Sequence, residues 1–217
     1  MPIYTLSCFK LPETLIEDVQ RAILQFWWGK KRSERRMQWI GWRITCRSKS
    51  QRGLNFKDLK AFNLAMLAKQ GWRLLTKTNF LIFRVYRSKY FKDSNFLRVE
   101  VGINPSWGWR SIVEGRKVLE KGILWRVGTG SDIRIREDSW VRDYLAITLN
   151  TETNSEHNPT WVSDLLLPTK SWNQILIQEL FRPDIAEAII NTEIQQGDDE
   201  VTWLKEKNGC YSVASGY

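Results

Sequence analysis

Apolar side chains recur at helical spacing through the first half of the chain, beginning with a helix after residue 12. Pro12 and Glu13 mark its start, apolar residues follow at intervals of three and four, and Gly29 lies past its end. Asp58 is placed to cap a longer helix, in which the apolar positions between 59 and 75 cover more than one stripe. That second helix is therefore expected to pack on two sides.

Two more helices are predicted before residue 122. One starts at Asn79 in "NFLIFRVYRSKYF", and the other runs from a Ser106 cap to Lys121, with Gly122 as its stop. The first 122 residues are therefore expected to be mostly α-helical.

The period of the pattern changes after residue 122. "ILWRVGTGSDIRIRED" alternates apolar and polar residues on either side of a Gly-rich turn, and "VTWLKEKNGCYSV" does the same around Asn208-Gly209, so each predicts a β-hairpin. Amphipathic helices are expected around 171–181 and 183–194. The predicted fold class is mainly α with small antiparallel β-hairpins, an α+β arrangement.

These patterns divide the chain into four segments. Residues 1–122 form a basic helical region, and 123–149 a Trp-bearing hairpin and connection. Residues 150–160 are polar and without period, as in a linker, and 161–217 hold acidic helices and the second hairpin.

The composition predicts a folded chain in a reducing compartment. The 217 residues, 42% of them hydrophobic and 12 of them Trp, suffice for one large domain or two small ones. Cys8, Cys46 and Cys210 are too far apart in sequence for a CxxC ligand pair, so we expect reduced, buried thiols. No membrane-length apolar run or leader peptide is recognised, which predicts a soluble, intracellular chain with no membrane partner. Nucleus and mitochondrion both stay open.

Charge is distributed unequally between the two halves. Residues 1–130 hold 26 Lys and Arg against 9 Asp and Glu, a net +17, whereas 131–217 hold 7 against 15, a net −8. Because the local field determines where a polyanion docks, the first half is the candidate nucleic-acid-binding region, through RNA or DNA backbone. The alternative is that these basic helix faces are only solvated.

The candidate contact residues are basic and aromatic. Trp72 and Trp109 are the candidates for stacking on bases, although tryptophans are also common in cores. Glu114 is an expected i+3 partner among the charges of its helix. The candidate phosphate contacts are Lys30, Lys31, Arg32, Arg35, Arg36, Arg84, Arg87, Arg110, Lys117 and Lys121.

Groups suited to catalysis are few. The lone His157 lies in the polar linker without a nearby Cys. Asp198-Asp199 resembles the paired aspartates that hold magnesium in polymerases, but its polar flanks favour an acidic surface turn. "VGTGSD", from Gly128 to Asp132, could cradle a phosphate, yet it precedes a strand pattern and is interpreted as a hairpin turn. We predict no catalytic residue, no metal and no cofactor.

Several spaced motifs resemble one family. "FWWGK", "WIGW", "GLNFKDLKAFNLAMLAKQGWRLL", "YRSKYF", "NPSWGWRSI" and "ILWRVGTGSDIRIREDSW" occur in the order found after the polymerase core of plant LINE-type (non-LTR) retrotransposon reverse transcriptases. Departures include Arg52 and Asn55, where the family prefers glycine, and Arg136, where it has Trp. Related fragments occur as reading frames in plant mitochondrial genomes. The tail "VTWLKEKNGCYSVASGY" is similar to the opening of the family's zinc-binding domain and stops before any Cys or His ligand.

The resemblance implies a thumb-like and connecting region, with the catalytic aspartates of the parent enzyme upstream of this polypeptide. Such a region grips the template-primer duplex by its backbone without reading sequence. Three hypotheses follow: a non-catalytic nucleic-acid-binding part of a retroelement polymerase, an inert pseudogene-like relic whose apolar surfaces met the missing polymerase core, and a free-standing polymerase or nuclease. The lack of a carboxylate constellation disfavours the third.

Overall fold

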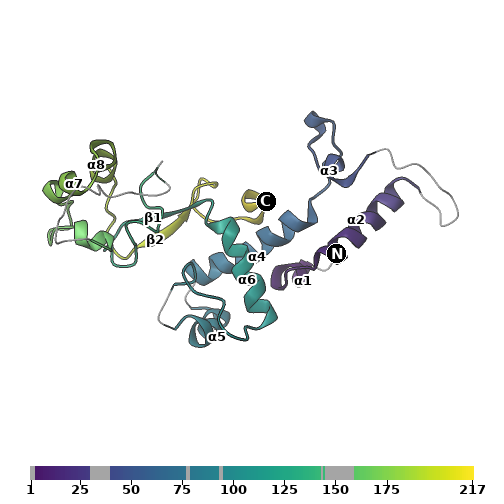
Figure 1. Cartoon of the computed structure of the whole chain (residues 1–217), viewed down its shortest axis with the longest axis horizontal. Helices are drawn as coiled ribbons and strands as arrows, with labels where there is room; N and C mark the ends of the chain where they lie inside the picture. The colour runs from purple at the N-terminus through teal and green to yellow at the C-terminus, as the bar shows by residue number, and fades with distance from the viewer. Residues whose placement is uncertain (1–2, 30–39, 77–78, 93–94, 143, 145–158) are drawn as a thin grey trace. The chain divides into compact units, whose positions relative to one another are not determined.

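The computed structural model describes residues 3–29, 40–76, 79–92, 95–142, 144 and 159–217. These residues are mostly helical, and the sheet among them has two antiparallel strands (Figure 1). The predicted fold class, mainly α with a small antiparallel β component, is confirmed. Two compact units are present: unit 1 comprises Met1–Glu120 and Ser212–Tyr217, and unit 2 comprises Lys121–Tyr211. The finer division into four segments stays a prediction.

Unit 1 is built from helices. Its elements in the described residues are α1 (Ile3–Cys8), α2 (Glu13–Trp27), α3 (Trp42–Thr45), the 3-10 turn η1 (Lys49–Gln51), α4 (Leu59–Thr76), α5 (Leu81–Tyr90), α6 (Trp107–Leu119) and α9 (Val213–Gly216). The four longer helices agree with the sequence pattern, apart from a start of α5 two residues later than predicted and an end of α6 two residues earlier.

Helix α4 is the central element of unit 1 and begins where the sequence predicted. The Asp58 carboxylate accepts from the backbone N–H groups of Lys60 and Ala61 at 2.9 and 3.1 Å, which satisfies two donors of the first turn. Leu67 and Ala68 are fully buried against α6. A Cβ on Gly115 of α6 would lie 2.5 Å from the Ala68 nitrogen, so the missing side chain lets the two helices approach closely.

Asn63 joins the N-terminal segment to α4. Its side chain is 1% exposed and accepts from Leu11 N at 2.9 Å, while its amide nitrogen donates to the carbonyl oxygens of Leu6 and Phe9 at 2.7 and 2.9 Å. A buried polar group with three partners fixes the path of the chain between α1 and α2.

An aromatic cluster joins α5 to α6. The Trp109 ring stacks on Tyr90 with 4.6 Å between ring centroids and an angle of 3°, and it also contacts Phe91 and Phe96. The predicted Ser106 cap is present, since its hydroxyl accepts from Trp109 N at 3.3 Å. Trp109 is 0% exposed.

Unit 2 contains β1 (Ile123–Arg126), the 3-10 turn η2 (Val162–Leu165), α7 (Gln174–Leu180), α8 (Pro183–Ile190) and β2 (Glu200–Trp203). The prediction that "ILWRVGTGSDIRIRED" forms a hairpin is wrong. Strand β1 pairs antiparallel with β2, in a register that places Ile123 opposite Trp203. The second predicted hairpin is wrong as well, because β2 pairs with β1 and is followed by a tight turn in which Trp203 N donates to Gly209 O at 2.8 Å. Each predicted hairpin thus supplies one strand of a long-range pair.

Two further expectations concern the cysteines and membrane helices. The cysteines are free, but Cys8 and Cys210 are exposed and Cys46 is half-buried, so the expectation of buried thiols is wrong. Burial, followed by the nearby negative charge of Asp58, raises the pKa of the Cys46 thiol.

In the part of the chain that the structure describes, no helix has the length and apolar character needed to cross a membrane.

Candidate nucleic-acid interface

The basic candidates fall into two groups. Lys30, Lys31, Arg32, Arg35 and Arg36, like His157, lie outside the described residues. The other five, Arg84, Arg87, Arg110, Lys117 and Lys121, are exposed, as phosphate contacts require. The first four of these belong to unit 1, and Lys121 begins unit 2.

The outer surface of α6 carries a stripe of exposed and half-buried side chains, formed by Trp107, Arg110, Glu114 and Lys117. Their spacing of three, four and three residues places them on one side of the helix, opposite the buried Trp109 and Ile112. This α6 stripe combines an aromatic ring, two cations and one carboxylate.

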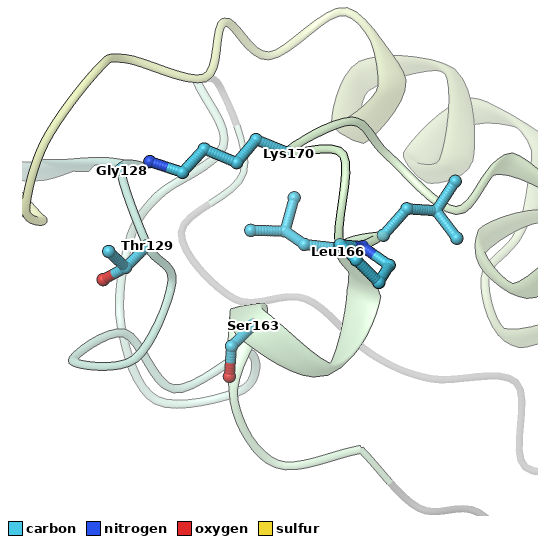
Figure 2. A pocket seen from close by; sticks show the side chains of 7 residues that line it. Gly128, Thr129, Ser163, Leu166 and Lys170 are labelled. Atoms are coloured by element: carbon cyan, nitrogen blue, oxygen red, sulfur yellow. The ribbon is translucent and has the colours of Figure 1, made fainter.

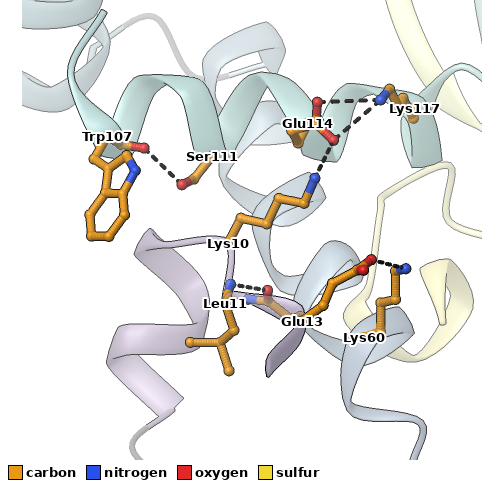
Figure 3. Close-up of polar contacts among 9 residues, drawn as sticks. Lys10, Leu11, Glu13, Lys60, Trp107, Ser111, Glu114 and Lys117 are labelled. Carbon is orange, nitrogen blue, oxygen red and sulfur yellow. Dashed lines mark hydrogen bonds and ion pairs between the residues drawn. The ribbon is translucent and has the colours of Figure 1, made fainter. Parts of the chain in front are cut away.

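Glu114 holds two cations at the α6 stripe. Its carboxylate accepts from Lys10 Nζ at 2.8 Å and from Lys117 Nζ at 3.2 Å, as Figure 3 shows. These interactions, the Lys10 hydrogen bond first, hold the pKa of Glu114 below its usual value against the opposing effect of desolvation. The expected i+3 partnership is confirmed, and Lys117 is consequently a partly neutralised cation.

The stacking candidates require a correction. Trp72 and Trp109 are 5% and 0% exposed, and the ring faces of Trp109 are covered by Tyr90 and Phe91. Neither indole is free to stack on a base. Trp107, which the sequence reasoning missed, is 70% exposed and lies three residues before Arg110. The signal for it was the spacing "WGW", because residues two apart on a helix point in different directions and only one of them can face the core.

The exposed arginines of α5 and α6 have no carboxylate partner in the part of the chain that the structure describes. Within the described ranges, no carboxylate lies within 4.0 Å of the guanidinium groups of Arg84, Arg87 or Arg110. Arg84 and Arg87 are one turn apart on α5, which the aromatic cluster around Trp109 fixes against α6. Two packed helices therefore present unneutralised positive charge in one unit.

The loop "VGTGSD" in unit 2 binds an anion that belongs to the chain itself. The Asp199 carboxylate accepts from Gly128 N at 2.7 Å, Gly130 N at 2.8 Å and Asp132 N at 2.9 Å. The N–H groups of three alternate residues converge on this one carboxylate, and we call the resulting anion-binding loop the nest. Gly130 has φ +73°, and a Cβ there would lie 2.5 Å from Ser163 N, so glycine is required on both grounds.

This finding changes two interpretations. The loop is a carboxylate-holding nest and not a hairpin turn, and Asp199 is a half-buried structural residue, whereas Asp198 is exposed as expected. Both oxygens of Asp199 already have hydrogen-bond donors, which favours a structural role over metal binding. Over the described ranges, no group of three His, Cys, Asp or Glu side chains could hold a metal ion.

A hollow of about 320 Å³ adjoins the nest. Figure 2 shows Lys170 extending across it towards the backbone of Gly128 and Thr129, with Leu166 and Ser163 on the opposite side. Apolar Leu167 and Pro168 complete its lining. Because the N–H groups of the nest are bound to Asp199, the hollow has one cation and no free anion cradle.

Two plant proteins are similar to the chain. An "Uncharacterized mitochondrial protein AtMg00310" of Arabidopsis thaliana is 38% identical over 144 residues, which cover 66% of this chain and 94% of that protein. A "Putative ribonuclease H protein At1g65750" of the same plant is 28% identical over 228 aligned residues. That alignment covers all of this chain but 36% of the longer protein.

No family model matches the chain, and no solved structure does. The plant relatives support the retroelement relationship in its coarse form. The first of them is matched over nearly its whole length at an identity that establishes common descent. The chain therefore belongs to the family of the Arabidopsis mitochondrial protein AtMg00310.

Proposed function

We propose that the chain is a non-catalytic part of a LINE-type reverse transcriptase that binds the sugar-phosphate backbone of a template-primer duplex without reading its sequence. The observation that carries this proposal is the unneutralised positive charge of Arg84, Arg87 and Arg110 on two packed helices, beside the exposed ring of Trp107. Cations on a helix surface neutralise phosphates and release counterions, whatever the base sequence. An exposed indole adds a stacking surface for an unpaired base.

The relatives and the spaced motifs support the same proposal. One relative is named as a ribonuclease H protein, which for that protein refers to cleavage of RNA. The motif order in this chain resembles the segment after a polymerase core, a position that contacts nucleic acid without carrying the catalytic aspartates. Asp199 accepts hydrogen bonds from three backbone N–H groups. In the pair Asp198-Asp199, which resembles the metal-binding aspartates of polymerases, one carboxylate therefore already has a structural role.

Filter binding at two salt concentrations tests the proposal. With single-stranded RNA, single-stranded DNA and an RNA–DNA duplex, affinity should fall between about 50 and about 200 mM salt, with a slope near −0.9 in log units per phosphate contacted on duplex. Replacing Arg84, Arg87 and Arg110 with Gln should weaken binding to all three and reduce the slope. The matched control removes three exposed lysines of unit 2, through Lys170→Asn, Lys205→Gln and Lys207→Gln, and should bind like wild type.

Absence of binding, or an affinity that does not change with salt, would overturn the proposal. Equal losses in the arginine variant and the lysine control would also overturn it, because the effect would then follow net charge and not a surface of unit 1.

A second candidate function rests on a different observation. Large apolar side chains are exposed on unit 1, among them Tyr4 at 88%, Phe26 at 86% and Leu81 at 74%. Exposed apolar surface marks an interaction site or an aggregation liability. The chain would then be an inert relic, or a scaffold whose partner is a polymerase core. Concentration-dependent aggregation of a chain that fails to bind nucleic acid at any salt concentration would favour this candidate.

A further inference from the structure

A second basic surface is formed by the segment that follows α2 and precedes α4 in the sequence. Residues 43–57 contain five cations and no Asp or Glu: Arg43, Arg47, Lys49, Arg52 and Lys57. All five are exposed. We call residues 42–57 the basic finger; in Figure 1 its segment around α3 extends away from the helices of unit 1.

The basic finger is held together by its own backbone. Thr45 O accepts from Leu54 N at 3.0 Å and from Phe56 N at 3.1 Å, and Arg47 O accepts from Asn55 N at 2.9 Å. Thr45 itself is buried, and its hydroxyl donates to Trp42 O at 2.6 Å. These bonds join the two ends of the loop, so its conformation is set before any ligand arrives.

The tip of the finger has an unusual backbone. Arg52 and Asn55 have φ of 60° and 58°, a left-handed conformation that is costly for a long side chain such as Arg. A Cβ on Gly53 would lie 2.0 Å from Arg47 O, so only glycine fits between these residues. Strain of this kind persists where the surrounding structure enforces it, and it is concentrated at ligand-binding sites.

Aromatic contacts attach the base of the finger to the rest of unit 1. The Phe56 ring meets Trp27 of α2 edge-on, with ring centroids 5.1 Å apart, and lies 5.9 Å from the Trp42 ring. The Lys57 ammonium lies 4.5 Å from the centre of the Phe62 ring on α4. The finger is therefore anchored at its base while its cations remain exposed.

The five cations of the finger have no ion-pair partner within the described part of the chain. Among the residues that the structure describes, no carboxylate lies within 4.0 Å of any of them. Five like charges within 15 residues repel one another, and a polyanion laid along them removes that repulsion. Backbone strain and charge repulsion in such a loop reduce the stability of the protein, and a bound anionic ligand would offset the repulsion.

We propose that the basic finger is a separate, preformed contact for the phosphate backbone of a nucleic acid. This inference rests on the proposed function and adds a contact surface to it that is distinct from α5 and α6. The cations are spread over a loop of several residues and offer no enclosed pocket, so the ligand is a polyphosphate chain and not a single phosphate. RNA and DNA share this chemistry, and the binding assay distinguishes them.

The first test removes charge from the tip. Arg47→Gln, Lys49→Gln and Arg52→Asn are combined, since Asn tolerates the left-handed conformation at position 52. The unit 2 variant Lys170→Asn/Lys205→Gln/Lys207→Gln is the control for net charge. Fluorescence anisotropy with labelled single-stranded RNA, single-stranded DNA and duplex DNA, at four salt concentrations, gives the slope of log affinity against log salt for each protein.

Loss of three phosphate contacts should reduce that slope by about 2.7 on duplex DNA and about 2.1 on single strands, with no change in the control. If wild type binds with a salt-dependent affinity and the finger variant has the same slope, the inference is wrong and the proposed function stands. If wild type does not bind, both fail. Equal slope losses on single-stranded RNA and single-stranded DNA support contact with the backbone that the two share, and a loss confined to one of them assigns the finger to that polymer.

The second test keeps the charge and disrupts the shape. Gly53→Ala should displace the Arg47 backbone and weaken binding several-fold at unchanged net charge, while far-UV circular dichroism confirms that unit 1 remains folded. Ser50→Ala, at an exposed position of the same loop, is the control. Wild-type affinity in a folded Gly53→Ala protein would show that no preformed finger is used.

Discussion

Removal of the Asp199 carboxylate is the sharpest perturbation of unit 2. In Asp199→Ala the N–H groups of Gly128, Gly130 and Asp132 lose their shared acceptor. Gly128 and Gly130 are buried and cannot recruit water without local opening, whereas Asp132 is exposed. An orphaned buried donor costs about 1–3 kcal/mol, so two of them give a loss of about 2–6 kcal/mol in the free energy of unfolding.

Asp198→Ala is the matched control for this change. Asp198 is exposed, and its neighbour Gln195 bonds to its backbone carbonyl and not to its carboxylate. Its replacement should cost less than about 0.5 kcal/mol. Asp199→Asn should fall between the two, because an amide keeps one accepting oxygen but directs an N–H₂ donor towards another donor.

Urea unfolding gives the global loss, and hydrogen exchange with peptide mass spectrometry locates it. In Asp199→Ala the amides of the peptide 123–135 should exchange faster, while those of α4 keep their wild-type rates. Equal unfolding free energies for the Asp198 and Asp199 variants, or unchanged exchange at the nest, would refute the claim that this carboxylate organises unit 2.

Three further predictions concern unit 1. Arg52→Gly should raise the free energy of unfolding by about 0.5–1 kcal/mol, because it removes an Arg from a left-handed conformation, and it should weaken nucleic-acid binding because a cation is lost. A variant in which stability and affinity both rise, or both fall, would contradict the proposed role of the basic finger. Asn63→Ala should cost about 2–4 kcal/mol in thermal or urea unfolding by leaving Leu11 N and two carbonyls unpaired, and a loss below 1 kcal/mol contradicts that assignment. Because its folded-state pKa is depressed, Glu114 contributes stability above its unfolded pKa and loses it as pH falls through the folded value, so the difference between wild type and Glu114→Gln should shrink in acid. The same variant releases Lys117 and should bind nucleic acid more tightly at pH 7; unchanged binding would place the α6 stripe outside the interface.

The helices were predictable because their signals are local. The Asp58 and Ser106 side chains cap the helices they were expected to cap, and the positions of α7 and α8 follow their apolar periods. The preference for glycine at positions 52 and 55 in the sequences that this chain resembles has a physical reason, because Arg52 and Asn55 both have positive φ. Glycine adopts that conformation without steric cost.

The strand pairing was not predictable by the same means. β1 and β2 each alternate as a hairpin strand does, but the alternation of one strand does not identify its partner. Here Ile123 pairs with Trp203, 80 residues further along the chain. The prediction that the loop from Gly128 to Asp132 is a hairpin turn was wrong for a related reason. The sequence showed a glycine loop suited to an anion, and a distant Asp199 supplies that anion.

The candidate interface was predictable only in part. Exposure of Arg84, Arg87 and Arg110 follows from the helical period, but the burial of Trp109 and exposure of Trp107 depend on which face of α6 meets α4. The basic finger has no periodic signal at all. A run of cations without a carboxylate, "RITCRSKSQRGLNFK", was its one trace in the sequence.

If the proposed function is correct, exposed cations of unit 1 lie against a nucleic-acid backbone. Photo-crosslinking of the full chain to RNA and to DNA carrying photoreactive backbone groups, with the attached peptides identified by mass spectrometry, tests it most directly. We expect crosslinks in the peptides of α5, the α6 stripe and the basic finger, each diminished by added salt. Crosslinks concentrated in unit 2, or spread evenly over both units and insensitive to salt, would contradict it.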